Sequence, residues 1–281
     1  MNGDWAAMIC SDYSSQFDPD CYLDHFFSEE ACLSRGAKVP VFALSQFARR
    51  LQLIVGATST KCNPSPSPTV VAPVRLLDVG AGPTIYSAVC FRDVVDEIFL
   101  SDYCERNLEE LRRWRERRCS FSWTPLLRSV ALLEGANAEA SSLQAMETAA
   151  RSRLVDVLRC DVRCPSVIRQ GEGTSSEASF DVVVTVFCLE SACASLDEYK
   201  EAVANVARLL RPNGFLIIGS VLEDDRYSFG PRQTFPLLYL TKDTILDALS
   251  SAGIDTRSDR SWCIEAEGSF FLLGKKTSLK C

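Results

Sequence analysis

The sequence predicts an α/β fold: a Rossmann-like, doubly wound and mostly parallel seven-stranded sheet, with helices on both faces and an N-terminal helical lid. Three observations support this prediction. Short apolar runs alternate with amphipathic segments between residues 74 and 276. Several of these runs are rich in β-branched residues, as strands buried on both faces are. The first run ends in a turn with two glycines, which leads into a candidate helix.

The N-terminal part of the chain has a helical pattern. Residues 12–55 place apolar side chains on one helix face, namely Leu44, Phe47, Ala48, Leu51 and Ile54. Residues 57–73 are rich in Ser, Pro and Thr without periodicity, which is typical of a flexible connector. We therefore divide the chain into a helical lid at 1–56, a linker at 57–73 and a Rossmann-like domain at 74–281 that forms one structural unit with the lid.

Strands and helices of the Rossmann-like domain are predicted from its apolar runs and its stop signals. The strand candidates are 74–79, 97–101, 153–162, 180–189, 214–222 and 269–274. A helix is predicted at 196–210, ended by Pro212-Asn213-Gly214, and another at 241–253 between the N-cap Thr241 and Gly253. Residues 134–152 are typical of a helix-bearing insertion, and residues 164–179 of a polar loop.

Composition and charge exclude several classes of protein. No apolar run reaches the roughly 18 residues that cross a bilayer, and the N-terminus lacks the basic and apolar regions of a signal peptide. We therefore expect a cytoplasmic protein that binds no membrane. A net charge of −7 argues against a nucleic-acid partner. The basic stretch 112–118 follows acids that form helical pairs with it, such as Glu109–Arg113.

The cysteines predict neither disulfides nor a metal site. All 13 are scattered, mostly within apolar runs, where a reduced thiol packs as a small hydrophobic group. Cys160 and Cys164, like Cys188 and Cys193, are spaced too far apart for a CxxC pair, and His25 is the only histidine. We therefore expect no bound metal.

The turn after the first strand candidate has the features of a nucleoside cradle. Gly80 and Gly82 let the backbone approach a ligand closely and turn into a helix. The second strand candidate ends about twenty residues later at Asp102, where an acid can bind both ribose hydroxyls.

The ligand of this turn is predicted to lack phosphates. A dinucleotide site needs a third glycine where this sequence has Ile85, and Pro83 removes a backbone donor that a pyrophosphate would use. The third strand candidate ends in Asp161 and Val162, an acid and an apolar neighbour that suit an adenine. The three strand ends together predict S-adenosylmethionine as the cofactor.

Several motifs extend this prediction to a family. They are DVGAGPTIY (78–86), SDYCERNLEELRRW (101–114), FSW (121–123), LEG (133–135), CDV (160–162), FCLESA (187–192), LLRPNGFLII (209–218) and the upstream pattern of Tyr13, Phe17-Asp18-Pro19 and Tyr22-Leu23. In these motifs the chain resembles the small-molecule amine methyltransferases, which act on nicotinamide, phenylethanolamine, indolethylamines and thioethers. The resemblance runs from residue 13 to residue 276. It implies a monomer with a helical lid over both ligands.

The resemblance also implies a set of cofactor-binding residues. By position they are Tyr13, Tyr22, Phe27, Gly80, Gly82, Thr84, Tyr86, Asp102, Tyr103, Cys104, Asn107, Asp161, Val162 and Val186. Phe27 stands where the family often has a tyrosine, so one hydroxyl contact to the cofactor is expected to be missing.

The acceptor site is predicted from chemistry and from position. An alkyl amine must lose a proton before its nitrogen can attack, which calls for a nearby carboxylate. Asp224 matches an acid that contacts the amine in the phenylethanolamine-type members, and we assign Asp224 and Tyr22 as catalytic. Ser220 stands where the nicotinamide enzyme has an aspartate. The predicted substrate-binding residues are Phe187, Ser220, Asp224, Tyr227 and Glu265.

These features predict an N-methyltransferase that transfers a methyl group to a small aromatic or arylalkyl amine by in-line displacement. A nicotinamide (pyridine) N-methyltransferase and a thioether S-methyltransferase are alternatives within the same family. Two further alternatives belong to other classes: a methyltransferase of protein or nucleic acid, and a non-catalytic protein that binds S-adenosylmethionine. The acidic balance and the predicted lid argue against a macromolecular acceptor.

Overall fold

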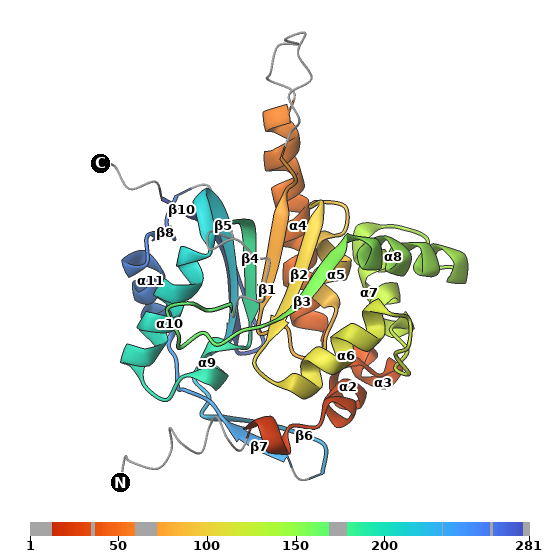
Figure 1. The fold of residues 1–281 in the computed structure, drawn as a ribbon, viewed down its shortest axis with the longest axis horizontal. Coiled ribbons are helices and arrows are strands. Elements are labelled where there is room, and N and C mark those ends of the chain that lie inside the picture. The colour runs from red at the N-terminus through yellow and green to blue at the C-terminus, as the bar shows by residue number, and fades with distance from the viewer. Residues whose placement is uncertain are drawn as a thin grey trace.

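A central sheet organises the molecule (Figure 1). The computed structural model describes residues 13–34, 37–59, 72–168, 179–231, 233–258 and 261–277. The eight-stranded sheet has the order β3-β2-β1-β4-β5-β10-β8, with β9 paired to β10. Its strands are β1 (Arg75–Val79), β2 (Glu97–Asp102), β3 (Leu154–Arg159), β4 (Phe180–Val186), β5 (Leu210–Val221), β8 (Ile254–Asp255), β9 (Trp262–Ala266) and β10 (Ser269–Lys276). The predicted α/β class is confirmed, with one strand more than expected because β9 folds back onto β10.

The parallel part of the sheet creates the position for a ligand. β1 pairs in parallel with β2 on one side and with β4 on the other, so that Leu77 lies between Phe99 and Val183. β3 and β5 extend the parallel strands outward, and β10 is antiparallel to β5. The strand order reverses between β1 and β4, and ligands of such sheets bind beyond the carboxyl ends of the strands at this reversal.

Helices cover both faces of the sheet and bury two hydrophobic cores. One core receives Leu76 of β1 and is covered by α4 (Lys38–Ser59), α5 (Tyr86–Phe91), α6 (Glu105–Arg115), α7 (Thr124–Glu134) and α8 (Ala140–Arg153). The other receives Leu77 and is covered by α10 (Leu196–Arg208) and α11 (Lys242–Ser251). Successive residues of β1 enter opposite cores because side chains alternate along a strand.

The observed ends of several helices and strands differ from the predicted ones. The helical segment 12–55 contains α2 (Pro19–Phe27), α3 (Glu29–Ser34) and α4, and α4 continues to Ser59, into the predicted linker. The strand candidate 180–189 stops at Val186 and is followed by the short helix α9 (Leu189–Ala192). Most of the linker (60–71) and of the polar loop (169–178) lies outside the described residues. Thr241 caps α11 as predicted, since its Oγ1 accepts a hydrogen bond from Thr244 N at 3.3 Å.

A hairpin that the sequence pattern did not predict lies outside the main sheet. Its strands, β6 (Arg226–Phe229) and β7 (Gln233–Pro236), form a separate two-stranded sheet between β5 and α11. In Figure 1 the hairpin and α2 lie at the same end of the sheet. Phe229 and Phe235 of the hairpin pack with Phe17 and with Tyr22 of α2. Four-residue strands are too short for the alternation test, which explains why they were missed.

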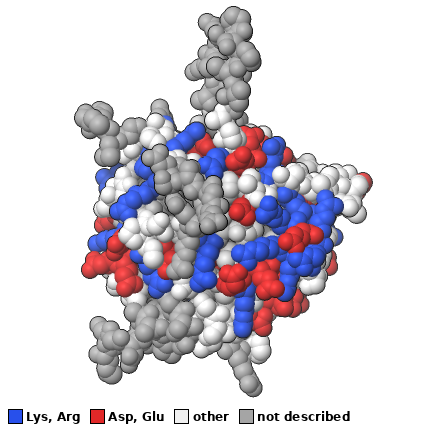
Figure 2. Space-filling view, in the orientation of Figure 1, with Lys and Arg blue, Asp and Glu red and all other residues white. Residues whose placement is uncertain are grey.

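Charged side chains of both signs share the surface of the molecule. Arg113 pairs with Glu109 at 2.6 Å, as predicted, and Figure 2 shows basic and acidic side chains intermixed on this face of the molecule. Within the ranges the structure describes, no group of three potential metal ligands occurs, and no helix is long and apolar enough to cross a membrane.

Candidate active site

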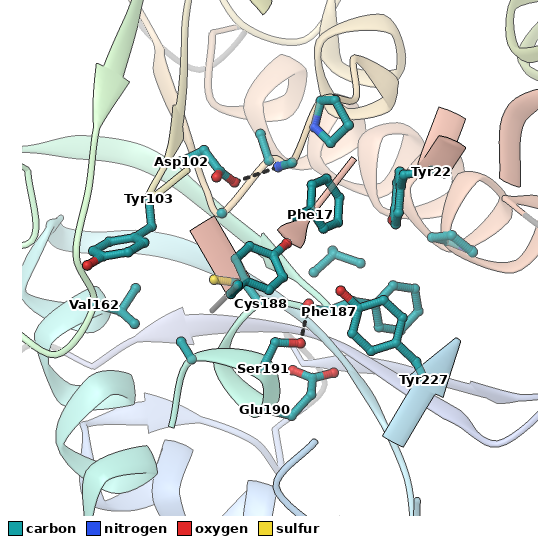
Figure 3. Close-up of a pocket in the computed structure, with 18 of the residues that line it drawn as sticks. Phe17, Tyr22, Asp102, Tyr103, Val162, Phe187, Cys188, Glu190, Ser191 and Tyr227 are labelled. Carbon is teal, nitrogen blue, oxygen red and sulfur yellow. Dashed lines mark hydrogen bonds between the residues drawn. The ribbon is translucent and has the colours of Figure 1, made fainter. Parts of the chain in front are cut away.

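A cavity of about 260 Å³ opens at the carboxyl ends of β1, β2 and β4 (Figure 3). Asp102, Tyr103 and Val162 lie on one side of it, and Tyr22, Tyr227 and Glu190 lie on the other. The N-terminal segment supplies Tyr13, Phe17 and the α2 residues Tyr22, Phe26 and Phe27 to its wall. The cavity is therefore built from segments far apart in the chain.

The glycine turn is held in a shape that only glycine adopts easily. Gly80 and Gly82 have φ angles of +76° and +62°. A methyl group on Gly80 would overlap the side chain of Cys188, which packs directly against the turn. The backbone N–H groups of Gly80 and Ala81 both donate to Ser101 O at 2.9 Å, which ties the turn to β2.

Asp102 is fixed at the end of β2 by donors from its own chain. Its Oδ2 accepts a hydrogen bond from Gly82 N at 2.8 Å, and its Oδ1 accepts from Cys104 N at 2.8 Å and from Asn107 Nδ2 at 3.0 Å. Burial raises the pKa of this carboxyl, and the three donors oppose that shift by stabilising the anion. Asp102 is therefore an oriented acceptor at the cavity wall, which suits the hydroxyls of a ribose.

A second acid, Asp161 of the CDV motif, lies in the part of the cavity where the sequence predicts the adenine. Asp161 is bound by Arg163 through Nε–Oδ1 and Nη2–Oδ2 hydrogen bonds of 3.0 Å each. Burial alone would raise the pKa of Asp161, but the hydrogen bonds from Arg163 outweigh it and lower the pKa. The Arg163 guanidinium also lies 5.4 Å from the centre of the Tyr103 ring. Arg163 lines the cavity but was not predicted, although it directly follows the motif.

Aromatic rings form most of the remaining wall. Tyr22 packs edge-on against Phe229 of the hairpin, with 5.2 Å between ring centres. Phe27 stacks on Tyr86 at 6.0 Å and is 2% exposed. Burial raises the pKa of Tyr22, so its hydroxyl stays neutral at physiological pH. This part of the cavity excludes water and suits a flat, apolar ligand.

One carboxyl group stands among these rings. Glu190 lies in α9, lines the cavity and is 1% exposed. Its Oε1 accepts a hydrogen bond from Val221 N at 2.9 Å, while Oε2 has no hydrogen-bond partner among the described residues. Burial raises the pKa of Glu190 to about 7. The sequence analysis quoted this residue within FCLESA without giving it a role; an acid just after a buried strand was the available signal.

A sequence profile of the NNMT/PNMT/TEMT family matches residues 6–277, nearly the whole chain. The chain belongs to the NNMT/PNMT/TEMT family. It is therefore an S-adenosylmethionine-dependent methyltransferase, as the glycine turn and the resemblance predicted.

Individual relatives agree with this assignment. Nicotinamide N-methyltransferase of Caenorhabditis elegans is 29% identical over 270 residues, covering 94% of this chain and 90% of the relative. Indolethylamine N-methyltransferase of Mus musculus is also 29% identical, covering 86% and 83% of the two chains. Magnesium protoporphyrin IX methyltransferase of Synechocystis PCC 6803, solved with bound SAM, superposes with a TM-score of 0.52 at 12% identity, covering 98% of both chains. That last likeness shows the Rossmann-like fold alone.

The residues of this NNMT/PNMT/TEMT family member fit the cofactor. The glycine turn has no room for a side chain at Gly80, and Pro83 has no N–H to offer a phosphate. Predicted cofactor residues that line the cavity are Tyr13, Tyr22, Phe27, Gly80, Gly82, Tyr86, Asp102, Tyr103, Asp161, Val162 and Val186. Thr84, Cys104 and Asn107 do not line it. Thr84 and Asn107 support the turn and Asp102 from behind, because Thr84 Oγ1 donates to Ala81 O at 2.7 Å and Asn107 donates to Asp102.

The predicted acceptor residues divide into two groups. Phe187 and Tyr227 line the cavity, whereas Ser220, Asp224 and Glu265 do not. Ser220 is fully buried on the α10 face of β5, because strand alternation turns it away from the cavity. Asp224 is exposed, and its Oδ1 accepts from the backbone N of Asp225 at 2.8 Å. Glu265 lies on β9 and pairs with Lys242 at 2.8 Å.

Proposed function

We propose that this protein methylates the nitrogen of a small aromatic or arylalkyl amine, and that Glu190 binds and deprotonates that amine. The single observation that supports this most is the half-satisfied carboxyl of Glu190 in an aromatic wall. A cationic amine would be a charge-assisted partner of the Glu190 carboxyl, and the rings would hold the aromatic part. The names of the relatives, which include nicotinamide and indolethylamine N-methyltransferases, agree with this acceptor class.

The chemistry needs one proton transfer and correct alignment. S-adenosylmethionine supplies an electrophilic methyl group on a positively charged sulfur. The N–C bond forms as the S–C bond breaks, and the ammonium proton must leave before the nitrogen can attack. A carboxyl with a pKa of about 7 accepts a proton at neutral pH, so Glu190 can take it. The buried aromatic wall excludes water and aligns the two ligands.

Asp224 is exposed whereas Glu190 is buried in the cavity wall, so Asp224 becomes the second candidate acid. Asp224 lies in the turn before β6, whose Tyr227 lines the cavity. We propose that it attracts the cationic amine toward the cavity without contacting it during the reaction. Tyr22 is half-buried on the side of the cavity that also carries Tyr227 and Glu190, and we propose that it helps to orient the methyl group and its acceptor.

A methyl-transfer screen with paired variants tests this function. The acceptors are 2-phenylethylamine, tryptamine, nicotinamide and a thioether, with S-adenosylhomocysteine binding followed by calorimetry. Glu190→Gln should lower kcat/KM for the alkyl amines by about 10²–10³-fold, and far less for nicotinamide, whose ring nitrogen carries no proton at neutral pH. Asp224→Asn is the matched acid-to-amide control and should lower kcat/KM for the alkyl amines by less than about tenfold.

Two outcomes would contradict the proposal. Equal losses on alkyl amines and nicotinamide would remove Glu190 from proton handling. Cofactor binding without methylation of any acceptor would indicate a binding protein that has lost turnover.

We also propose that the protein works as a cytoplasmic monomer, with residues 1–56 as a lid on the domain at 74–281. The N-terminal segment contributes five described residues to the cavity wall, which supports its role as a lid: Tyr13, Phe17, Tyr22, Phe26 and Phe27. The net charge of −7 supports a small-molecule acceptor rather than a nucleic acid. Sedimentation analysis with and without S-adenosylhomocysteine should give one monomeric species; a dimer would contradict this.

A further inference from the structure

A second set of polar atoms lies behind the cavity wall, in the core between the sheet and α10. Oε2 of Glu190, the hydroxyl of Tyr199 and the hydroxyl of Ser220 are buried, and within the described part of the chain none has a hydrogen-bond partner. Buried polar atoms in native proteins nearly always have a partner. Three such atoms from neighbouring elements therefore indicate a polar group with a common role.

The three side chains come from elements that pack on one another. Ser220 lies on the face of β5 whose neighbours, Leu216 and Ile218, enter the core with α10, and Tyr199 belongs to that same core. Glu190 reaches β5 through its bond to Val221 N, next to Ser220. The three elements that carry these residues, α9, α10 and β5, contact one another. Burial raises the pKa of Tyr199, and the nearby Glu190 carboxyl raises it further.

We infer that Tyr199 and Ser220 are positioning residues for Glu190: their hydroxyls bind the open oxygen of its carboxyl, directly or through one enclosed water, and thereby set its orientation and its charge. This inference rests on the proposed function, in which Glu190 meets the amine. It assigns Ser220 a role from behind the wall instead of the direct acceptor contact predicted from the sequence. It also assigns a role to Tyr199, which lies outside the cavity wall.

The other titratable groups around Glu190 stay uncharged near neutral pH. Burial raises the pKa values of Cys188, the N-cap residue of α9, and of Tyr227 on β6, both of which lie near Glu190. Glu190 is therefore the group that changes charge in this cluster between pH 5 and 9. Hydroxyl donors favour the carboxylate over the carboxylic acid, so removing one should raise the Glu190 pKa by about one unit.

The first experiment measures this pKa without any acceptor. The free energy of unfolding is compared between each protein and its Glu190→Gln derivative from pH 5 to 9, because the difference follows the titration of Glu190. This difference should fall as pH rises above the unfolded-state pKa of 4.5 and level off at the folded-state pKa, about 7 in the wild type. We call this folded-state value the titration midpoint. In Tyr199→Phe and Ser220→Ala, the midpoint should rise by about one pH unit. Ser45→Ala, which removes a buried hydroxyl in α4, should leave it unchanged.

The second experiment follows kcat/KM against pH for 2-phenylethylamine and nicotinamide. The acid limb for 2-phenylethylamine should move up with the unfolding midpoint in Tyr199→Phe and Ser220→Ala, and the nicotinamide profile should not move. Unchanged midpoints in both folded variants would overturn the inference. Moved midpoints, combined with full activity of Glu190→Gln on the alkyl amine, would instead contradict the proposed function.

Discussion

The Asp102 carboxylate accepts hydrogen bonds from Gly82, Cys104 and Asn107, whereas the Glu190 carboxyl accepts one from Val221 and leaves one oxygen open. The cofactor side of the cavity is thus ordered by the chain itself. The acceptor side combines aromatic rings with a polar group that lacks a second partner. The cofactor is the same in every turnover, so its side of the cavity can be fully preorganised. A cationic acceptor adds a charge-assisted partner to the Glu190 carboxyl only when it binds.

The largest loss of cofactor affinity is expected from a mutation on the preorganised cofactor side of the cavity. Asp102→Asn replaces one carboxylate oxygen by an amide N–H, which would face a backbone donor of Gly82 or Cys104. We expect S-adenosylhomocysteine to bind about 10²–10³-fold more weakly by calorimetry. Asp96→Asn, an exposed change whose carboxylate accepts from Val74 N, should leave binding unchanged. Similar affinities for the two variants would show that the cofactor side tolerates an unsatisfied group.

A pair of glycines tests how tightly the turn is packed. Gly80 and Gly268 both have positive φ, but a methyl group would overlap Cys188 at Gly80 and meets nothing within 4 Å at Gly268. Gly80→Ala should lower the free energy of unfolding by about 3 kcal/mol, from backbone strain and overpacking. Gly268→Ala should cost about 1 kcal/mol, from strain alone. Urea unfolding measures both, and equal costs would mean that Cys188 moves aside freely.

Asp78, buried below the glycine turn, gives the cofactor side a pH dependence. Burial raises its pKa from 3.8 to about 7, and a hydrogen bond from Ser87 opposes part of the shift. Between these pH values the folded state keeps a proton that the unfolded state has lost, so the free energy of unfolding falls as pH rises. Asp78→Asn should remove about 2 kcal/mol of the decrease between pH 5 and 8. Identical urea-unfolding profiles of variant and wild type would contradict this.

The smallest effect, a change in S-adenosylmethionine affinity, is expected from a substitution at Phe27. Phe27 lines the cavity between Tyr86 and Trp123, at the position where the resemblance noted in the sequence implies a tyrosine. Phe27→Tyr should strengthen S-adenosylmethionine binding about fivefold, because a hydroxyl becomes available to the cofactor. Phe42→Tyr, on the exposed face of α4, serves as the control. Weaker binding in Phe27→Tyr would show that the packed rings leave no space for the oxygen.

The same contrast explains which features could be predicted from sequence. Gly80, Asp102 and Asp161 lie at or just after the ends of β1, β2 and β3, so the strand ends and the glycines were enough to predict that they lie together. Tyr13 and Tyr22 were expected at the cofactor only from the family resemblance. The acceptor side joins residues 13–27, 187–192 and 221–237, and no local pattern shows that these segments meet. Glu190 was therefore overlooked.

The direction in which a side chain points was harder to predict from sequence than the part of the fold in which the residue lies. Ser220 was placed near the acceptor by its position in the chain, but the alternation of β5 turns it toward α10. Asp224 carries a suitable charge, yet its carboxylate binds the backbone of its own turn at the surface. Strand register and turn geometry depend on tertiary packing, which explains both differences.

The β6–β7 hairpin has a consequence for how acceptor preference can change. It forms its own sheet, closed at its base by the hydrogen bond from Leu237 N to Asp225 O at 2.8 Å. Exchanging it would break none of the strand pairings that position the glycine turn and Asp102. New acceptor preferences could therefore evolve, or be engineered, by replacing this hairpin together with the facing rings of α2, while the methyl-donor machinery is inherited unchanged.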